Sequence, residues 1–167
     1  MKKIILTTVI LTCIITANAQ NFGLRAGADF ATAEAEVEGL SVSDNETGFY
    51  VGLFAKLKII ENFKIRSEAN YINIKDLEQI QIPVLAEVGI SDKFNALAGP
   101  SFGFLLDTED EGRSFNFGID FGLSYDITEK FLVEARYSLG LSNLVDDNIY
   151  DIALKLHGLF IGVGYLF

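Results

Sequence analysis

Ten charged residues of both signs recur inside stretches where apolar residues alternate with small ones. Side chains at every second position of a strand share one face, so these charges would meet on the same side of a sheet. Acids and bases gathered away from water are stable only as hydrogen-bonded ion pairs. The chemistry predicted for them is therefore a structural ion-pair network, made by Arg25, Asp29, Lys56, Lys64, Arg66, Glu68, Glu87, Asp120, Glu134 and Arg136.

Catalytic chemistry has less support in this sequence. His157 is the single histidine, and no G-x-S-x-G nucleophile motif accompanies it. The acidic segments lack the D-x-D-x-D-G spacing of a calcium loop. We therefore predict no catalytic, cofactor-binding or metal-binding residue, no cofactor, and no enzyme activity. An outer-membrane enzyme that modifies lipid A, with His157 near the outer rim, is kept as an alternative.

Strict alternation is clearest at residues 114–126, S-F-N-F-G-I-D-F-G-L-S-Y-D. This periodicity of two predicts a β-strand, and it recurs eight times, with no long amphipathic helix between. The predicted strands lie near 21–30, 48–58, 63–73, 78–89, 94–105, 114–126, 131–142 and 150–167. In the last one the alternation slips around His157 and Gly158, which predicts a bulge there.

The alternation alone does not say which face is inside. In a soluble lipocalin-like ligand binder, the Phe-rich face would be the core. In a membrane barrel it would contact lipid, and the face with Gly, Ser and scattered charges would fill the interior. Strands of about ten residues can cross a bilayer, and Gly on a wet surface would weaken them. We therefore predict an all-β fold, an eight-stranded antiparallel up-and-down transmembrane β-barrel with a narrow lumen filled by side chains. The soluble binder remains the alternative.

The connections between the predicted strands alternate in length. Those at 59–62, 91–93 and 126–130 are short, while 31–47, 74–77, 106–113 and 143–149 include the longer, more acidic ones. This layout is typical of outer-membrane barrels, whose short turns face the periplasm. Because side chains would fill the lumen, a structural or surface-interaction role would lie in the acidic outer loops, where a protein partner could dock.

Aromatic residues mark the ends of the predicted strands. Each short turn ends in an acid, a polar residue and Phe, as in E-N-F, D-K-F and E-K-F. Aromatic side chains gather at the lipid–water boundary of barrels. The predicted interface aromatics are Phe22, Phe63, Phe94, Tyr125, Phe131 and Phe167.

The first residues form a separate unit. A short basic start, an apolar run over 4–15 and the A-N-A site at 17–19 predict a secretory signal peptide over 1–19, cleaved between Ala19 and Gln20. The mature barrel domain would span 20–167, with 11 basic and 23 acidic residues and a net charge of −12. That charge argues against nucleic acid as a partner. The only cysteine, Cys13, lies within the predicted leader.

The mature sequence resembles the small outer-membrane β-barrel domain proteins of Bacteroidota, the PorT-like group. The resemblance rests on G-L-R-A-G at 23–27, G-F-Y-V-G at 48–52, I-P-V at 82–84, A-G-P at 98–100, and V-E-A-R-Y at 133–137 followed by L-G-L. It implies an eight-stranded barrel in the outer membrane, in contact with outer-membrane lipid. The aromatic C-terminal strand ending in Phe167 resembles the signal read by the barrel-assembly machinery, which would be a partner during insertion.

Overall fold

The computed structural model describes residues 22–37, 40–75, 77–106, 114–142 and 152–167. The predicted signal peptide 1–19 with its cleavage site at Ala19 and Gln20, most of the connection 106–113, and the connection 143–149 lie outside the described residues. The strands are β1 Phe22–Val37, β2 Leu40–Ile60, β3 Phe63–Ile74, β4 Leu77–Gly89, β5 Phe94–Leu105, β6 Phe115–Asp126, β7 Phe131–Gly140 and β8 Ile152–Leu166. In the described part of the chain, no helix has the length and apolar character needed to cross a membrane.

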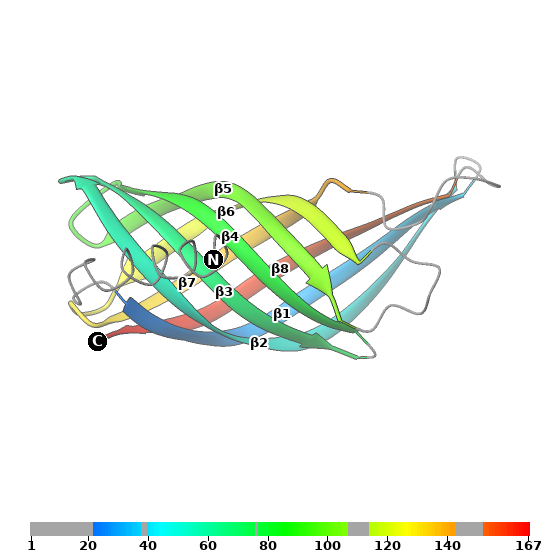
Figure 1. Ribbon diagram of the computed structural model, residues 1–167, viewed down its shortest axis with the longest axis horizontal. Helices are drawn as coiled ribbons and strands as arrows, with labels where there is room; N and C mark the ends of the chain where they lie inside the picture. The colour runs from blue at the N-terminus through cyan, green and yellow to red at the C-terminus, as the bar shows by residue number, and fades with distance from the viewer. Residues whose placement is uncertain (1–21, 38–39, 76, 107–113, 143–151) are drawn as a thin grey trace, which may run out of the picture.

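The eight strands form one closed barrel in sequence order, and every neighbouring pair is antiparallel (Figure 1). The ring closes between β1 and β8, which pair from Gly23 with Leu166 to Val37 with Ile152. The C-terminus lies at the end of the barrel that carries the short turns. We call this end the short-turn mouth and the other end the long-strand mouth. The predicted eight-stranded up-and-down barrel is confirmed.

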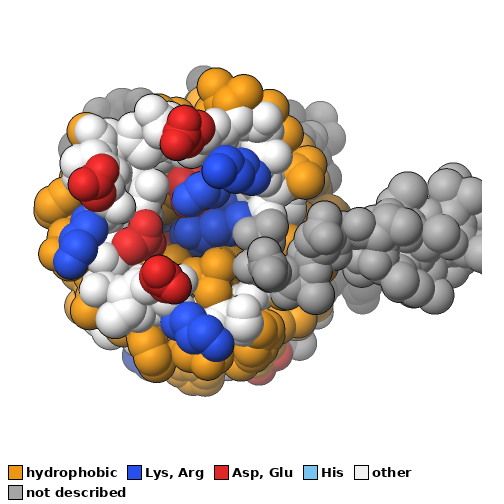
Figure 2. Space-filling model, turned by 90° about the vertical axis from the view of Figure 1, so that its left-hand side faces the viewer, with side chains coloured by type: hydrophobic (Ala, Val, Ile, Leu, Met, Phe, Trp, Pro, Cys, Tyr) orange, Lys and Arg blue, Asp and Glu red, His pale blue; other side chains and the backbone are white. Residues whose placement is uncertain are grey.

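The two faces of each strand differ as the alternation predicts. In β6, Phe121 and Leu123 are 48% and 52% exposed on the outside, whereas Asp120 and Ser124 are buried inside. The same division holds around the ring, and the space-filling view shows it directly. Looking into the short-turn mouth, hydrophobic side chains line the perimeter and charged ones gather around the hollow (Figure 2). The Phe-rich face therefore points outward.

One predicted connection is wrong. Residues 31–47 were expected to form an acidic loop, but 31–37 belong to β1 and 40–47 to β2, which pair without interruption from Phe22 with Ala55 to Val37 with Leu40. Ala, Glu and Asp disfavour strands by propensity, which made this segment look irregular. Pairing with β2 on one side and β8 on the other supplies the backbone hydrogen bonds that override the propensity.

The predicted bulge at His157 and Gly158 is also wrong. The register of β8 runs through both residues without a shift, against Thr32 and Ala31 of β1 and against β7. The alternation seemed to slip because apolar Leu156 and Phe160 share the inward face with Gly158. A register shift is instead found between Lys58 and Ile60, next to the short turn that joins β2 to β3.

Candidate functional site: the barrel interior and its two mouths

Glu68 lies at the centre of the interior and pairs with three arginines. Its Oε2 accepts hydrogen bonds from Arg25 and, at 2.8 Å, from Arg136 Nη1, and its Oε1 lies 2.7 Å from Arg66 Nε in an ion pair. Asn70, two residues further along β3, donates a 3.0 Å hydrogen bond from its Nδ2 to Glu68 Oε2. All four charged side chains are fully buried. One carboxylate on β3 therefore joins β1 and β7 across the lumen.

Two further acids surround this centre. Glu134 pairs with Arg25 and, at 2.8 Å, with Arg66 Nη2. Asp120 accepts a 2.7 Å hydrogen bond from Ser138 Oγ and lies 3.3 Å from Arg136 Nε. Close pairing with an opposite charge offsets part of the cost of burying each of these groups.

A second group of ion pairs lies closer to the short-turn mouth. Glu87 Oε1 accepts from Lys56 Nζ at 2.9 Å and from Lys64 Nζ at 3.2 Å, and its other oxygen lies 3.9 Å from Arg66 Nη1. Lys64 is the most exposed member of the group.

Each interior arginine also lies over an inward-facing aromatic ring, a feature that the sequence reading missed. The guanidinium carbon of Arg25 lies 4.6 Å from the ring centre of Tyr50, that of Arg66 4.5 Å from Phe54, and that of Arg136 5.5 Å from Phe160. Such cation–π contacts strengthen when they are shielded from water. The signal was available, because Tyr50 and Phe54 share the sequence parity of Lys56, and Phe160 shares that of Gly162 and Gly164.

Glycines make room for these rings. A Cβ on Gly162 would come within 2.1 Å of the Tyr50 hydroxyl, and one on Gly23 within 2.4 Å of the Phe54 ring. Buried Leu85, Leu97 and Leu132 take further interior space. The lumen is thus packed with large side chains opposite glycine.

An apolar layer separates the ion pairs from the long-strand mouth. Tyr50, Ile72 and Phe160 pack together, with Ile74 against them. Tyr50 and Phe160 meet edge to face, with ring centres 5.3 Å apart. We call this layer, which lies between the network and the long-strand mouth, the apolar plug.

Asp29 differs from the other nine residues of the predicted network. Its side chain is inside the barrel and only 2% of the residue is exposed. Within the described residues it forms no ion pair, and its Oδ1 has no hydrogen-bond partner. It lies on the long-strand side, where its register partner in β8 is Phe160. The other nine all take part in ion pairs; that these pairs stabilise the barrel stays a prediction.

We expect Arg136→Leu to lower the thermal transition seen as a heat-dependent gel shift. Leucine cannot pair with Glu68 or Asp120, although Arg25, Arg66 and Ser138 still contact those acids. Leaving buried acceptors underpaired costs about 1–3 kcal/mol. Lys58→Leu at the exposed end of β2 is the matched control. A transition equal to that of the unmodified protein would contradict the proposed role of Arg136.

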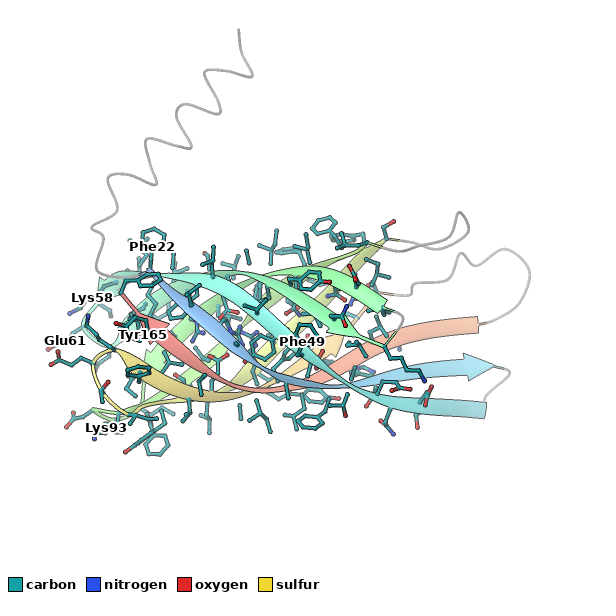
Figure 3. The ribbon with its side chains drawn as sticks, turned by 90° about the horizontal axis from the view of Figure 1, so that it is seen from below. Phe22, Phe49, Lys58, Glu61, Lys93 and Tyr165 are labelled. Carbon is teal, nitrogen blue, oxygen red and sulfur yellow. The ribbon has the colours of Figure 1, made fainter. Side chains whose placement is uncertain are left out.

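The predicted interface aromatics all lie at the short-turn end of their strands. Phe22, Phe63, Phe94 and Phe131 begin β1, β3, β5 and β7, while Tyr125 and Phe167 lie at or next to the ends of β6 and β8. Figure 3 shows Phe22 at this end, together with Tyr165, Lys58 and Lys93. Phe94 packs on Tyr125 with ring centres 4.8 Å apart, and Phe131 packs on Tyr165 at 4.9 Å.

A second group of aromatics near the other end was not predicted. Phe102, Phe104, Phe115 and Phe117 pack together on β5 and β6, with ring centres 5.4–6.5 Å apart. Phe94 and Phe104 lie ten positions apart in β5. At about 3.3 Å per residue and a tilt of roughly 40°, the height between them is about 25 Å. This matches the apolar band of about 25 Å on outer-membrane barrels.

His157 lies on the outward face of β8. It is in register with Thr32 of β1 and Leu139 of β7. Its ring is nearly parallel to that of Tyr137, at 10° and 6.4 Å between centres. The structure therefore places His157 on the opposite face of the sheet from the buried acids of the interior.

A closed barrel with an apolar outer band, two aromatic groups and a charged interior defines an outer-membrane β-barrel protein. The sequence comparison agrees, because residues 17–146 match the family described as outer membrane protein beta-barrel domain. This chain belongs to that family, and it is a protein of the outer membrane. No curated protein sequence matches the chain at a significant level.

Solved structures show the same fold at low sequence identity. Neisserial surface protein A is 19% identical, with a TM-score of 0.54 over 87% of this chain and 97% of its own. Ail of Yersinia pestis, the attachment invasion locus protein, is 16% identical, with a TM-score of 0.51 over 89% of this chain and 99% of its own. A de novo designed transmembrane β-barrel is 11% identical, with a TM-score of 0.51 over 84% and 95%. These likenesses concern the fold.

Proposed function

We propose that this protein is a non-enzymatic outer-membrane barrel that displays an acidic projection, formed by the ends of β1, β2 and β8, to a basic partner outside the cell. The observation that carries the proposal is the length of β1 and β2. Their pairing continues to Val37 and Leu40, whereas β3 pairs with β2 only from Phe49 onward. Residues 40–48 therefore extend beyond β3, and Figure 1 shows β1, β2 and β8 reaching past the other strands.

The charge of this projection favours a basic partner. Its strands contain the acids Glu34, Glu36, Asp44 and Glu46 and one base, Lys155 of β8, in register with Glu34. Glu46 pairs with the exposed Lys75 at 3.5 Å, while Asp44 is exposed. Like charges that are displayed together attract a complementary surface and speed its encounter. The projection thus takes the role that the sequence reading gave to an acidic loop over 31–47.

The remaining parts of the proposal rest on the sequence. We propose that residues 1–19 are a signal peptide, that the chain belongs to the PorT-like group of Bacteroidota, and that the barrel-assembly machinery inserts it.

A packed lumen favours a scaffold over a channel. The outward position of His157, beside Tyr137 and Thr32, favours a non-enzymatic role.

Neutralising the projection tests the proposed partner site. We expect the fourfold variant Glu34→Gln, Glu36→Gln, Asp44→Asn and Glu46→Gln to bind a decalysine peptide at least tenfold more weakly. Binding would be measured on the full barrel in lipid nanodiscs, at low and physiological salt. A single charge pair at a protein surface contributes little binding free energy and is screened by salt. A measurable loss of peptide affinity therefore requires all four substitutions together.

The matched control removes acids at the short-turn mouth, with Glu61→Gln, Asp92→Asn, Asp126→Asn and Glu129→Gln. This control should leave the peptide affinity within threefold. Equal losses in both variants would show that only net charge matters, which would overturn a specific site on the projection.

A further inference from the structure

We propose that the long-strand mouth holds a binding site for a small organic cation, an ammonium group that carries a short apolar chain or ring, with Asp29 as its counter-ion. The site goes beyond the proposed partner surface, because it is centred on Asp29 inside the barrel, although Asp44 and Glu46 of the projection also line it. A cavity of about 210 Å³ opens there above the apolar plug. Exposed Asp44 and Lys75 stand at its rim, so the cavity reaches solvent.

The floor of the cavity is apolar. Ile72 and Phe160 of the plug line it, together with Ile74, Leu77 and Leu156. This surface would contact the chain or ring of a ligand and gain from excluding water. An apolar floor has no oxygen atoms that could replace the water around a metal ion, so it favours an organic cation over a metal.

Asp29 supplies the polar anchor. It lines the cavity, is 98% buried, and has an Oδ1 without a hydrogen-bond partner among the described residues. A buried acceptor without a partner is costly, and an ammonium group donates up to three hydrogen bonds. A ligand placed with its nitrogen at Asp29 would rest its apolar part against Phe160, the register partner of Asp29.

The other charges of the lining agree with a cationic ligand. The acids are Asp29, Asp44 and Glu46. Of the two basic residues along the described lining, Lys75 already pairs with Glu46, and His157 stacks its ring on Tyr137 of the outward face. Gln79, Gln81 and Asn116 add neutral polar groups. The cavity is smaller than the roughly 300 Å³ at which drug-sized pockets begin, so the ligand is a compact amine.

A fluorine NMR titration of the full barrel in phosphatidylcholine nanodiscs would test the site. The probe is para-fluorophenethylamine, and the neutral comparison is para-fluorophenethyl alcohol. We expect saturable binding of the amine, at least tenfold weaker binding of the alcohol, and at least tenfold weaker amine binding by Asp29→Asn. That factor corresponds to losing one charge-assisted hydrogen bond.

Asp126→Asn removes the same charge at the short-turn mouth and should leave amine binding within threefold. Leu156→Trp fills the cavity while keeping Asp29, so it should abolish saturable binding even if Asp29→Asn fails to fold. No saturable binding to the unmodified protein, equal binding of the alcohol, or unchanged binding by either cavity variant would overturn the proposal.

Discussion

Glu68→Gln is expected to lower the free energy of unfolding by about 3–5 kcal/mol, the cost of breaking a buried ion pair by removing one partner. Glutamine keeps the shape of the side chain but not its charge. Arg25, Arg66 and Arg136 all pair with Glu68. Each keeps a contact with Glu134 or Asp120, but the ten interior charged residues would then comprise five bases and only four acids. Urea unfolding in nanodiscs, followed by tyrosine fluorescence and the gel shift, would measure the change.

The control for this variant is Glu129→Gln, which makes the same chemical change at an exposed residue of the β6–β7 turn. Exposed charges contribute little, so its unfolding midpoint should match that of the unmodified barrel. If Glu68→Gln and Glu129→Gln had the same midpoint, the interior ion pairs would not hold the barrel together.

Leu53→Arg is expected to cost about 2–4 kcal/mol, because it places a charge near the middle of the lipid-facing band. Leu53 is 57% exposed on the outside of β2, in register with Leu24 of β1 and Ala69 of β3. Folding the purified chain into nanodiscs at a series of urea concentrations would give the difference from the unmodified protein.

Ile60→Arg provides the comparison at the end of the same strand. Ile60 is 64% exposed, slightly more than Leu53, but it lies at the short turn, where a charge reaches water at a cost of about 0–1 kcal/mol. If water rather than lipid surrounded the barrel, both substitutions would change the free energy of unfolding by the same small amount. A small, equal effect would therefore refute the assignment of the Phe-rich face to lipid.

Much of this fold could be predicted from the alternation, because a period of two reports directly which side chains share a face. Arg25, Glu68 and Arg136 were found in this way, and they meet inside although they are far apart in sequence. A closed ring brings every inward position close to the others. Pairing partners could not be predicted, since the pattern gives the face and not the height within the barrel.

The errors have a common origin in reading each residue type alone. Ala33 and Glu34 disfavour strands, but pairing on both sides places them in β1. Phe160 was given no place in the predicted interior, whereas the structure places it inside, near Arg136. Asp29 was grouped with the network by parity, although it lies beyond the ion pairs on the side of the cavity. Only the three-dimensional register separates these cases.

The pairing of β1 with β8 has a consequence for how the molecule is made. The first strand of the barrel finds one of its two neighbours only when the last strand has been synthesised. Until β1 and β8 pair, a newly made chain has two unpaired strand edges and an exposed hydrophobic surface. Both features promote aggregation with other chains. A product truncated before β8 keeps both edges unpaired. The 15 residues of β8 are therefore what converts an aggregation-prone open sheet into a closed barrel.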